Sequence, residues 1–173
     1  MHIAEKKKSE NISEYIIFLY KTEDLIRAFD LNKNEISEYV VKHFPVPEDE
    51  KEYQRNWYME FCDTMIDQGL QEKGHIEEAE KLVQSLMEIH LQLLGTDKKY
   101  QDVFMYARPF IQKNIEFSNQ QINNPIQICL NGVYGYLISQ INGRNINNEQ
   151  KEMLESFGLV LSYLSHEYKQ HNQ

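Results

Sequence analysis

Apolar residues recur three and four positions apart along nearly the whole chain, which is the spacing of a helix with one buried face. The clearest example lies near the C-terminus, where apolar positions follow one another at intervals of 3, 4, 3 and 4: Leu154, Phe157, Leu161, Leu164 and Tyr168. Sustained alternation of apolar and polar residues, which would predict strands, does not occur. The pattern therefore predicts an all-α protein.

Glycine, proline and asparagine residues divide this pattern into seven segments. We expect helices over residues 9–29, 32–43, 48–69, 74–95, 100–117, 125–141 and 147–168, with an extended connection at 44–47 and an Asn- and Gln-rich one at 118–124. Asn147 with Gln150 has the spacing of a capping box, and Pro125 suits a first helical position. Pro109 cannot donate a backbone hydrogen bond, so we expect a break at Arg108.

The length and the short connections predict a single domain over residues 1–173, built as an antiparallel bundle of six or seven helices. Gly132 and Gly135 lie inside one of the predicted helices, where glycine is unfavourable. Close approach of a second helix would explain both of these residues.

Charge and composition narrow the choice of partners. The formal net charge of −9 disfavours binding to nucleic acid, because a phosphate backbone would be repelled. Apolar runs are too short to span a membrane, and the start of the chain does not resemble a signal peptide. Cys62 and Cys129 stand in apolar surroundings and are interpreted as reduced thiols, so we expect a cytoplasmic protein.

Glu23 occupies a position on the apolar stripe of the first predicted helix where another apolar residue is expected. One interpretation is a carboxylate at the edge of the stripe that reaches water, and this is the one we favour from the sequence. The other is a buried carboxylate, which requires a partner such as Arg27, four residues further on, or a donor on another helix.

Two histidines are candidates for chemistry. Glu72 and His75 form an E-x-x-H step of the kind found in di-iron bundles, but it occurs once, so we expect neither a metal nor another cofactor. His90 falls beside a buried stripe, where a hydrogen-bonded core histidine is the simpler interpretation.

Motifs for nucleotide binding and for serine or zinc hydrolases are missing from the sequence. The first hypothesis is therefore a non-enzymatic protein that acts by binding a protein partner or a second copy of itself. The alternative is a helical bundle that binds a small molecule or a metal in a polar pocket. Its candidate ligand-binding residues are Glu23, Asp24, Arg27, Glu72, His75 and His90.

Three segments carry a resemblance to a known family: ENISEYIIFLYKTEDLIRA at residues 10–28, QEKGHI at 71–76 and LNGVYGYLI at 130–138. The chain resembles, over its whole length, a family of uncharacterised helical proteins from Bacteroidetes, which is classed as a domain of unknown function. The resemblance implies a single helical domain and brings no catalytic or ligand residues. It also implies that residues 23–27, together with Gly74 and His75, are recurring positions of the family.

Overall fold

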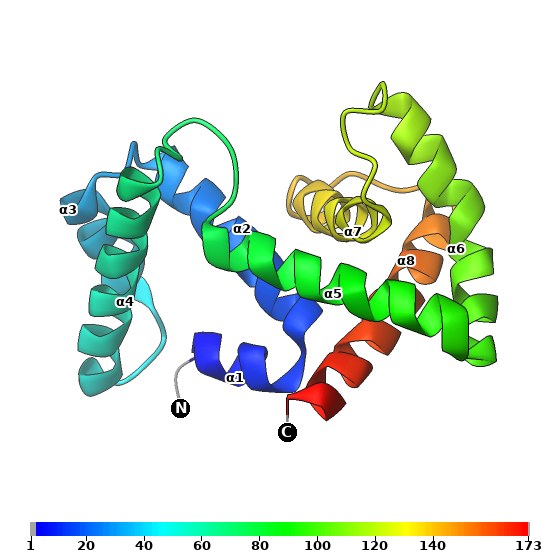
Figure 1. The fold of residues 1–173 in the computed structure, drawn as a ribbon. Helices are drawn as coiled ribbons and strands as arrows, with labels where there is room; N and C mark the ends of the chain where they lie inside the picture. Colours follow the sequence, from blue (N-terminus) through cyan, green and yellow to red (C-terminus); the bar gives the residue numbers. More distant parts are fainter. Residues whose placement is uncertain (1–2, 173) are drawn as a thin grey trace.

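The computed structural model describes residues 3–172. Within this range there are eight α-helices and no strand, which confirms the all-α prediction (Figure 1). The α-helices are α1 (Ile3–Glu10), α2 (Ile12–Ala28), α3 (Lys33–Glu35), α4 (Glu48–Asp67), α5 (Glu77–Thr96), α6 (Lys98–Phe117), α7 (Pro125–Ile141) and α8 (Asn148–His171). A π-helical turn, Ile36–Val40, and a 3-10 turn, Val41–His43, follow α3.

Local side chains determine where most of these helices begin. Five of them start at an Asn or Asp whose side chain accepts hydrogen bonds from backbone N–H groups of the first turn: Asn11, Asn32, Asp97, Asn124 and Asn147. Asn147 and Gln150 form the reciprocal capping box predicted from their spacing. By contrast, the N-cap residue of α5 is Ile76, which has no side chain that can cap the helix.

Several helix boundaries differ from those predicted. The segment expected as one helix from Asn32 is divided into α3, the π-helical turn and the 3-10 turn. The segment over residues 9–29 is interrupted at Asn11, whose extended backbone ends α1 and whose side chain caps α2. The segment expected from Gly74 begins instead at Glu77, because Gly74 has a φ of +95°, which an α-helix does not permit.

The break expected at Arg108 is wrong, because α6 runs without interruption through Pro109. Pro109 lies on the exposed side of the helix, and Met105, four residues earlier, is also exposed. Water can therefore solvate the Met105 carbonyl that proline leaves without a helical donor. The neighbouring Ala107 and Ile111 keep the opposite side of α6 buried.

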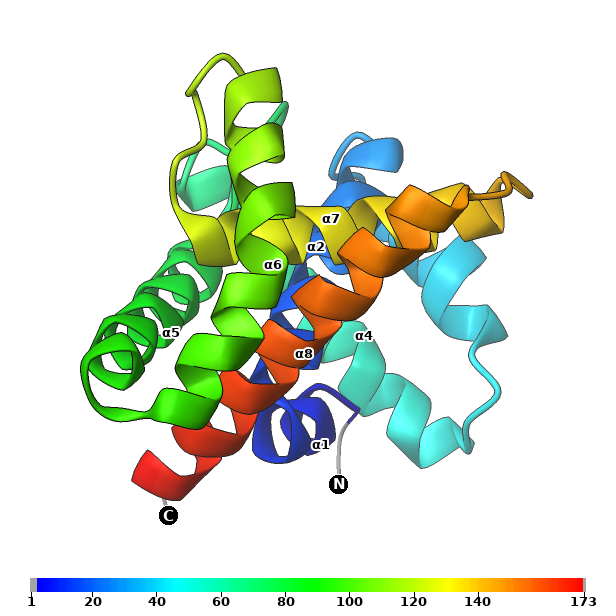
Figure 2. The ribbon, with the colours of Figure 1, turned by 90° about the vertical axis from the view of Figure 1, so that its right-hand side faces the viewer.

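Helix α2 is central to the packing, since it contacts α1, α5, α7 and α8. Buried apolar residues from α1, α2 and α4 to α8 form one cluster. The helices do not share a single axis: α7 is viewed nearly end-on in Figure 1, where α5 lies across the view. In Figure 2, α8 runs diagonally and meets α7 near the start of α8. No helix within residues 3–172 combines the length and apolar character needed to cross a membrane.

The two glycines of α7 have different environments. A Cβ atom at Gly132 would lie 2.7 Å from the ring of Phe157 on α8, so the expected close approach is confirmed there. At Gly135 nothing lies within 4 Å of such an atom, so the same expectation is wrong for this residue. Only the first glycine is needed for α7 to pack against α8.

Candidate functional site

Glu23 is the most unusual polar residue of the structure, because its side chain is 0% exposed. Its Oε1 atom accepts a hydrogen bond of 2.8 Å from the backbone N–H of Ile76, and its Oε2 atom lies 2.6 Å from Nδ1 of His75. The interpretation of Glu23 as a solvated edge residue is therefore wrong. A pair with Arg27 is not formed either, since both oxygens point to the connector that precedes α5.

This contact also caps α5. Gln68, at the end of α4, accepts a hydrogen bond from the N–H of Glu77, and Glu23 accepts one from Ile76. Two side chains from outside α5 thus accept hydrogen bonds from the N–H groups at its start, because the apolar side chain of Ile76 cannot do so. The positive end of the helix dipole stabilises the buried carboxylate in return.

Arg27 holds the same connector in place. Its guanidinium donates to the backbone carbonyls of Leu70 and Gly74 and, over 3.1 Å, to the carboxylate of Asp24. Gly74 has a φ of +95°, which favours glycine, and a Cβ atom there would lie 2.9 Å from a Leu70 methyl carbon, so the Leu70 side chain would have to shift. The connector is therefore fixed against α2 by Glu23 and Arg27.

Two tyrosines complete the arrangement from α2 and α7. The rings of Tyr20 and His75 are stacked with centroids 3.7 Å apart, and the Tyr20 hydroxyl is hydrogen-bonded to Gln127 on α7. Burial raises the pKa of Tyr20 to about 12. The Tyr134 hydroxyl donates to Asp24, and burial followed by this carboxylate raises the pKa of Tyr134.

We call this arrangement the α2–α7 junction. It consists of Tyr20, Glu23, Asp24, Arg27, His75 and Tyr134. An ionised carboxylate can only accept hydrogen bonds, so with Glu23 in that form the Nδ1 atom of His75 is the donor. In a neutral ring the Nε2 atom then has a free lone pair, and the His75 side chain is 33% exposed.

The structure brings together Glu23, Asp24, Arg27 and His75 but leaves out the two other candidates. Glu72 is exposed in the connector and takes no part in the hydrogen bonds of the junction. Among residues 3–172, no three His, Cys, Asp or Glu side chains are grouped so that they could hold a metal ion.

His90 lies in the core, as the hydrogen-bonded interpretation expects. It is 2% exposed, its Nδ1 atom lies 2.6 Å from the hydroxyl of Tyr100, and its ring contacts Phe104. Burial lowers the pKa of His90 to about 4, so the ring is neutral at physiological pH.

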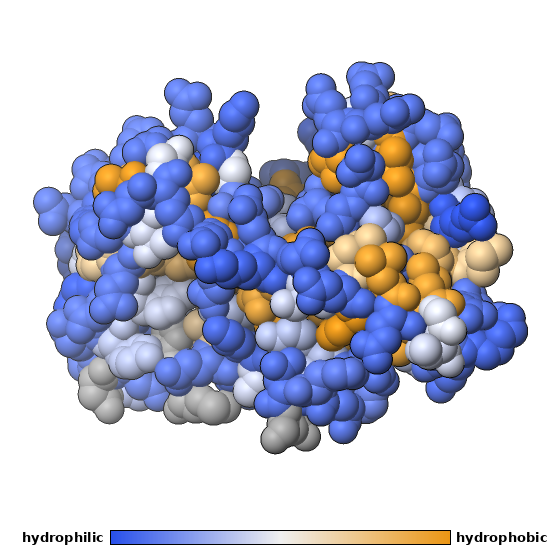
Figure 3. Space-filling model, in the orientation of Figure 1, coloured by the Kyte–Doolittle hydropathy of each residue, from blue (hydrophilic) through white to orange (hydrophobic). Residues whose placement is uncertain are grey.

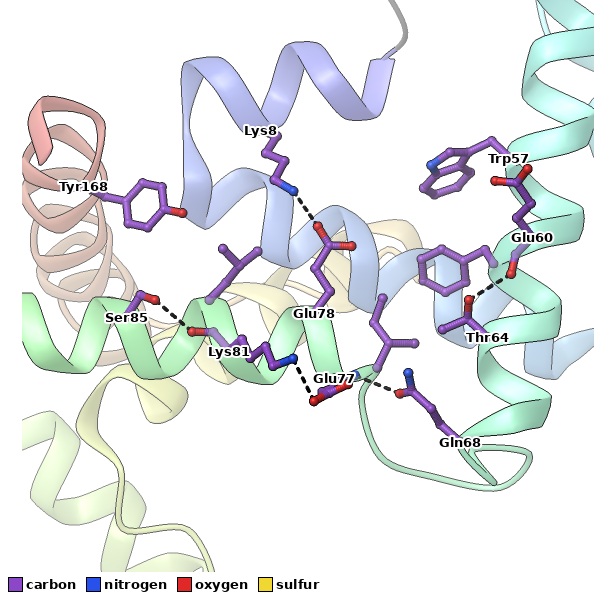
Figure 4. A pocket seen from close by; sticks show the side chains of 13 residues that line it. Lys8, Trp57, Glu60, Thr64, Gln68, Glu77, Glu78, Lys81, Ser85 and Tyr168 are labelled. Carbon is purple, nitrogen blue, oxygen red and sulfur yellow. Dashed lines mark hydrogen bonds and ion pairs between the residues drawn. The ribbon is translucent and has the colours of Figure 1, made fainter. Parts of the chain in front are cut away.

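A cavity of about 580 Å³ lies between α1, α4, α5 and α8, apart from the junction (Figure 4). Trp57 and Phe61 contribute apolar walls, and Lys8 and Glu78, which form an ion pair, are among the lining residues. Ile76 connects the two regions, because its side chain lines the cavity while its N–H donates to Glu23. None of the six candidate ligand-binding residues lines this cavity.

The second half of α7 is an exposed helix surface without charge. No charged or histidine side chain occurs over residues 117–143. Every residue from Gly132 to the end of α7 is at least partly exposed, in contrast to the first half of the helix. Tyr134, Ile138 and Ile141 are one turn apart on one side, and the two isoleucines are 38% and 71% exposed. We call these three residues the α7 face.

Apolar residues also gather over α5 and α6, on the right of the view in Figure 3. Leu91 on α5 is 58% exposed and Met105 on α6 is 55% exposed. Charged residues such as Lys98 and Asp102 lie close to them in the sequence. Charged residues therefore adjoin this surface in the sequence, whereas none occurs around the α7 face over residues 117–143.

Sequence reasoning did not find Tyr20, Tyr134 or the α7 face. Both tyrosines fall on apolar stripes, where they look like ordinary core residues. The absence of charge over residues 117–143 was a readable signal for the α7 face.

Fold and site together define an all-α protein in which a connector is fixed to a central helix through a buried glutamate and a partly exposed histidine. Residues 1–173 match the family described as Domain of unknown function (DUF4924), and the chain belongs to this family. No curated protein and no solved structure matches the chain.

Proposed function

We propose that this protein is non-enzymatic and acts by association, and that a second copy of the chain binds to the α7 face. The observation that carries the proposal is the exposed, charge-free second half of α7 in a chain that is otherwise rich in charge. Exposed apolar surface of this kind is typical of protein–protein contacts.

Charge favours a second copy at this position over the other surfaces. Two copies, each with a net charge of −9, repel each other, and the repulsion is strongest where acidic residues face one another. Contact between two α7 faces around a two-fold axis brings together helix segments that carry no charged side chain of their own. The face uses the same residues on both copies, as an isologous interface requires.

Sedimentation equilibrium of the purified chain tests the proposal over loading concentrations up to about 100 µM, where an association with a dissociation constant of about 10 µM is readily measured. We expect a reversible dimer. Raising the salt concentration should strengthen the dimer, because salt screens the repulsion between the two acidic copies and leaves apolar contacts intact.

Three variants locate the interface. Ile138→Asp and Ile141→Asp place carboxylates against their symmetry mates and should weaken the dimer at least about tenfold. Leu91→Asp is the matched control, since Leu91 is comparably exposed on another helix. A monomeric wild type would overturn the proposal, as would a dimer that is lost in Leu91→Asp and kept in both α7 variants.

We further propose that the chain is a single cytoplasmic domain that binds neither nucleic acid nor a membrane, and that its family is from Bacteroidetes. The single cluster of buried apolar residues supports one domain. Cys62 and Cys129 are both buried free thiols, as expected in a reducing compartment, and burial raises the pKa of each. The net charge supports the exclusion of nucleic acid.

A further inference from the structure

The α2–α7 junction holds one imidazole in a defined orientation. Nδ1 of His75 faces the buried carboxylate of Glu23 at 2.6 Å, and the ring lies flat against Tyr20, which is itself 1% exposed. The side chain nevertheless remains one-third exposed. The carboxylate thus lies in the core, and the ring that faces it reaches the surface.

Capping α5 does not require this arrangement. Elsewhere the chain begins its helices with a local Asn or Asp, which caps the first turn without burying a charge. A fully buried carboxylate has a desolvation cost that a neutral amide avoids. What the carboxylate provides, and an amide does not, is a negative charge that keeps the proton on Nδ1 and makes Nε2 more electron-rich.

We propose that His75 is a phosphoryl-accepting site, and that its Nε2 atom takes the phosphoryl group from a small acyl phosphate. The Nε2 lone pair attacks phosphorus, the new P–N bond forms, and the P–O bond to the acyl group breaks. The carboxylate of the donor leaves with that electron pair. The proton on Nδ1 stays in the hydrogen bond to Glu23, which balances the positive charge that develops on the ring.

The surroundings favour an anionic group at this position. Arg27 donates to the carbonyl of Gly74, the residue directly before His75, so its positive charge is held against the same connector. The positive end of the α5 dipole begins two residues after His75, at Glu77. Asp24 and the glutamates in the first turn of α5 would repel a phosphoryl group, and both features oppose this repulsion.

Incubation with acetyl phosphate, followed by peptide mass spectrometry under conditions that preserve phosphohistidine, tests the proposal. His43 and His166 are exposed histidines of the same chain and serve as internal controls. We expect His75 to be phosphorylated at least about tenfold faster than either. Phosphorus NMR should show attachment at Nε2.

Glu23→Gln tests whether the rate at His75 depends on the Glu23 carboxylate that orients the ring or only on the exposure of the ring. Glutamine keeps the shape of the side chain and loses its charge. Phosphorylation of His75 should slow at least about tenfold in this variant, while His43 and His166 keep their rates. Tyr163→Phe removes a hydroxyl that lies outside the junction and should leave the His75 rate unchanged, and circular dichroism verifies that both variants are folded. Equal rates at all three histidines, or an unchanged His75 rate in folded Glu23→Gln, would overturn the proposal.

Discussion

Two histidines are hydrogen-bonded at places where helices meet, and their surroundings differ. In the α2–α7 junction, His75 faces a carboxylate and is one-third exposed. Where α5, α6 and α8 meet, His90 faces the phenol of Tyr100 and is 2% exposed. Each place also has a tyrosine that donates to an aspartate, Tyr134 to Asp24 in the first and Tyr163 to Asp97 in the second.

The difference shows how a polar group can be buried with or without a charge. His90 is neutral, satisfied by one hydroxyl and enclosed by aromatic rings, so its role is packing. Glu23 requires a backbone donor, an imidazole and a helix dipole to be buried, and the imidazole that faces it is one-third exposed. Of the two places, only the α2–α7 junction combines a buried carboxylate with a partly exposed imidazole.

Removing the internal charge should have the largest effect. Glu23→Ala leaves the N–H of Ile76 without its acceptor and His75 without its partner, and we expect a loss of about 3 to 4 kcal/mol in the free energy of unfolding. Glu23→Gln can still accept from Ile76 and should lose about 1 kcal/mol. Urea melts of both variants measure the difference. A loss below about 0.5 kcal/mol in Glu23→Ala would show that the carboxylate is solvated.

Lowering the pH should reduce the stability of the protein through His90. Burial holds the pKa of His90 at about 4, below its ordinary value of 6.5. Above pH 6.5 the ring is neutral in both folded and unfolded chains, so its contribution to stability is complete. As the pH falls from 6.5 to about 4, only the unfolded chain takes up the proton, and stability should fall by about 2 to 3 kcal/mol.

The measurement is the free energy of unfolding of wild type and of His90→Gln at a series of pH values. The difference between the two isolates His90 from the many carboxylates that titrate in the same range. A difference that does not change between pH 6.5 and about 4 would mean that His90 is protonated in the folded protein.

Replacing Arg27 should reduce the free energy of unfolding more than replacing an arginine at the surface. Arg27→Ala removes donors to two backbone carbonyls and to Asp24, and we expect a loss of about 1 to 2 kcal/mol. Arg55 is the matched control, because it bonds Ser37 and Glu52 and is 40% exposed. Arg55→Ala should lose about 0.5 kcal/mol, and equal losses in the two variants would contradict the anchoring of the connector by Arg27.

Removing either tyrosine–aspartate hydrogen bond should reduce stability by a similar amount, and these losses should be the smallest. Tyr134→Phe and Tyr163→Phe each remove one hydroxyl that donates to a partly exposed aspartate. Each should lose about 0.5 to 1 kcal/mol in thermal or urea melts. A loss several times larger in Tyr134→Phe alone would indicate that this hydroxyl supports Glu23 as well as Asp24.

Helix positions and caps were predictable because they depend on residues close in the sequence, as at Asn147 with Gln150. The position of Glu23 on an apolar stripe identified it as unusual for the same reason. Its partner was not predictable, because His75 reaches Glu23 only through the path of the connector, and that path depends on the φ of Gly74 and on Arg27. Helix α6 was predicted to break because exposure at Pro109 depends on the packing of other helices.

The protonation of the two imidazole rings tests the central claim most directly, and nitrogen-15 NMR measures it in the folded chain. His75 should show its proton on Nδ1 and a bare Nε2 at neutral pH, and Glu23→Gln should abolish this preference without altering the His90 signals. A His75 ring with its proton on Nε2, as in a free histidine, would contradict a buried carboxylate that orients the imidazole.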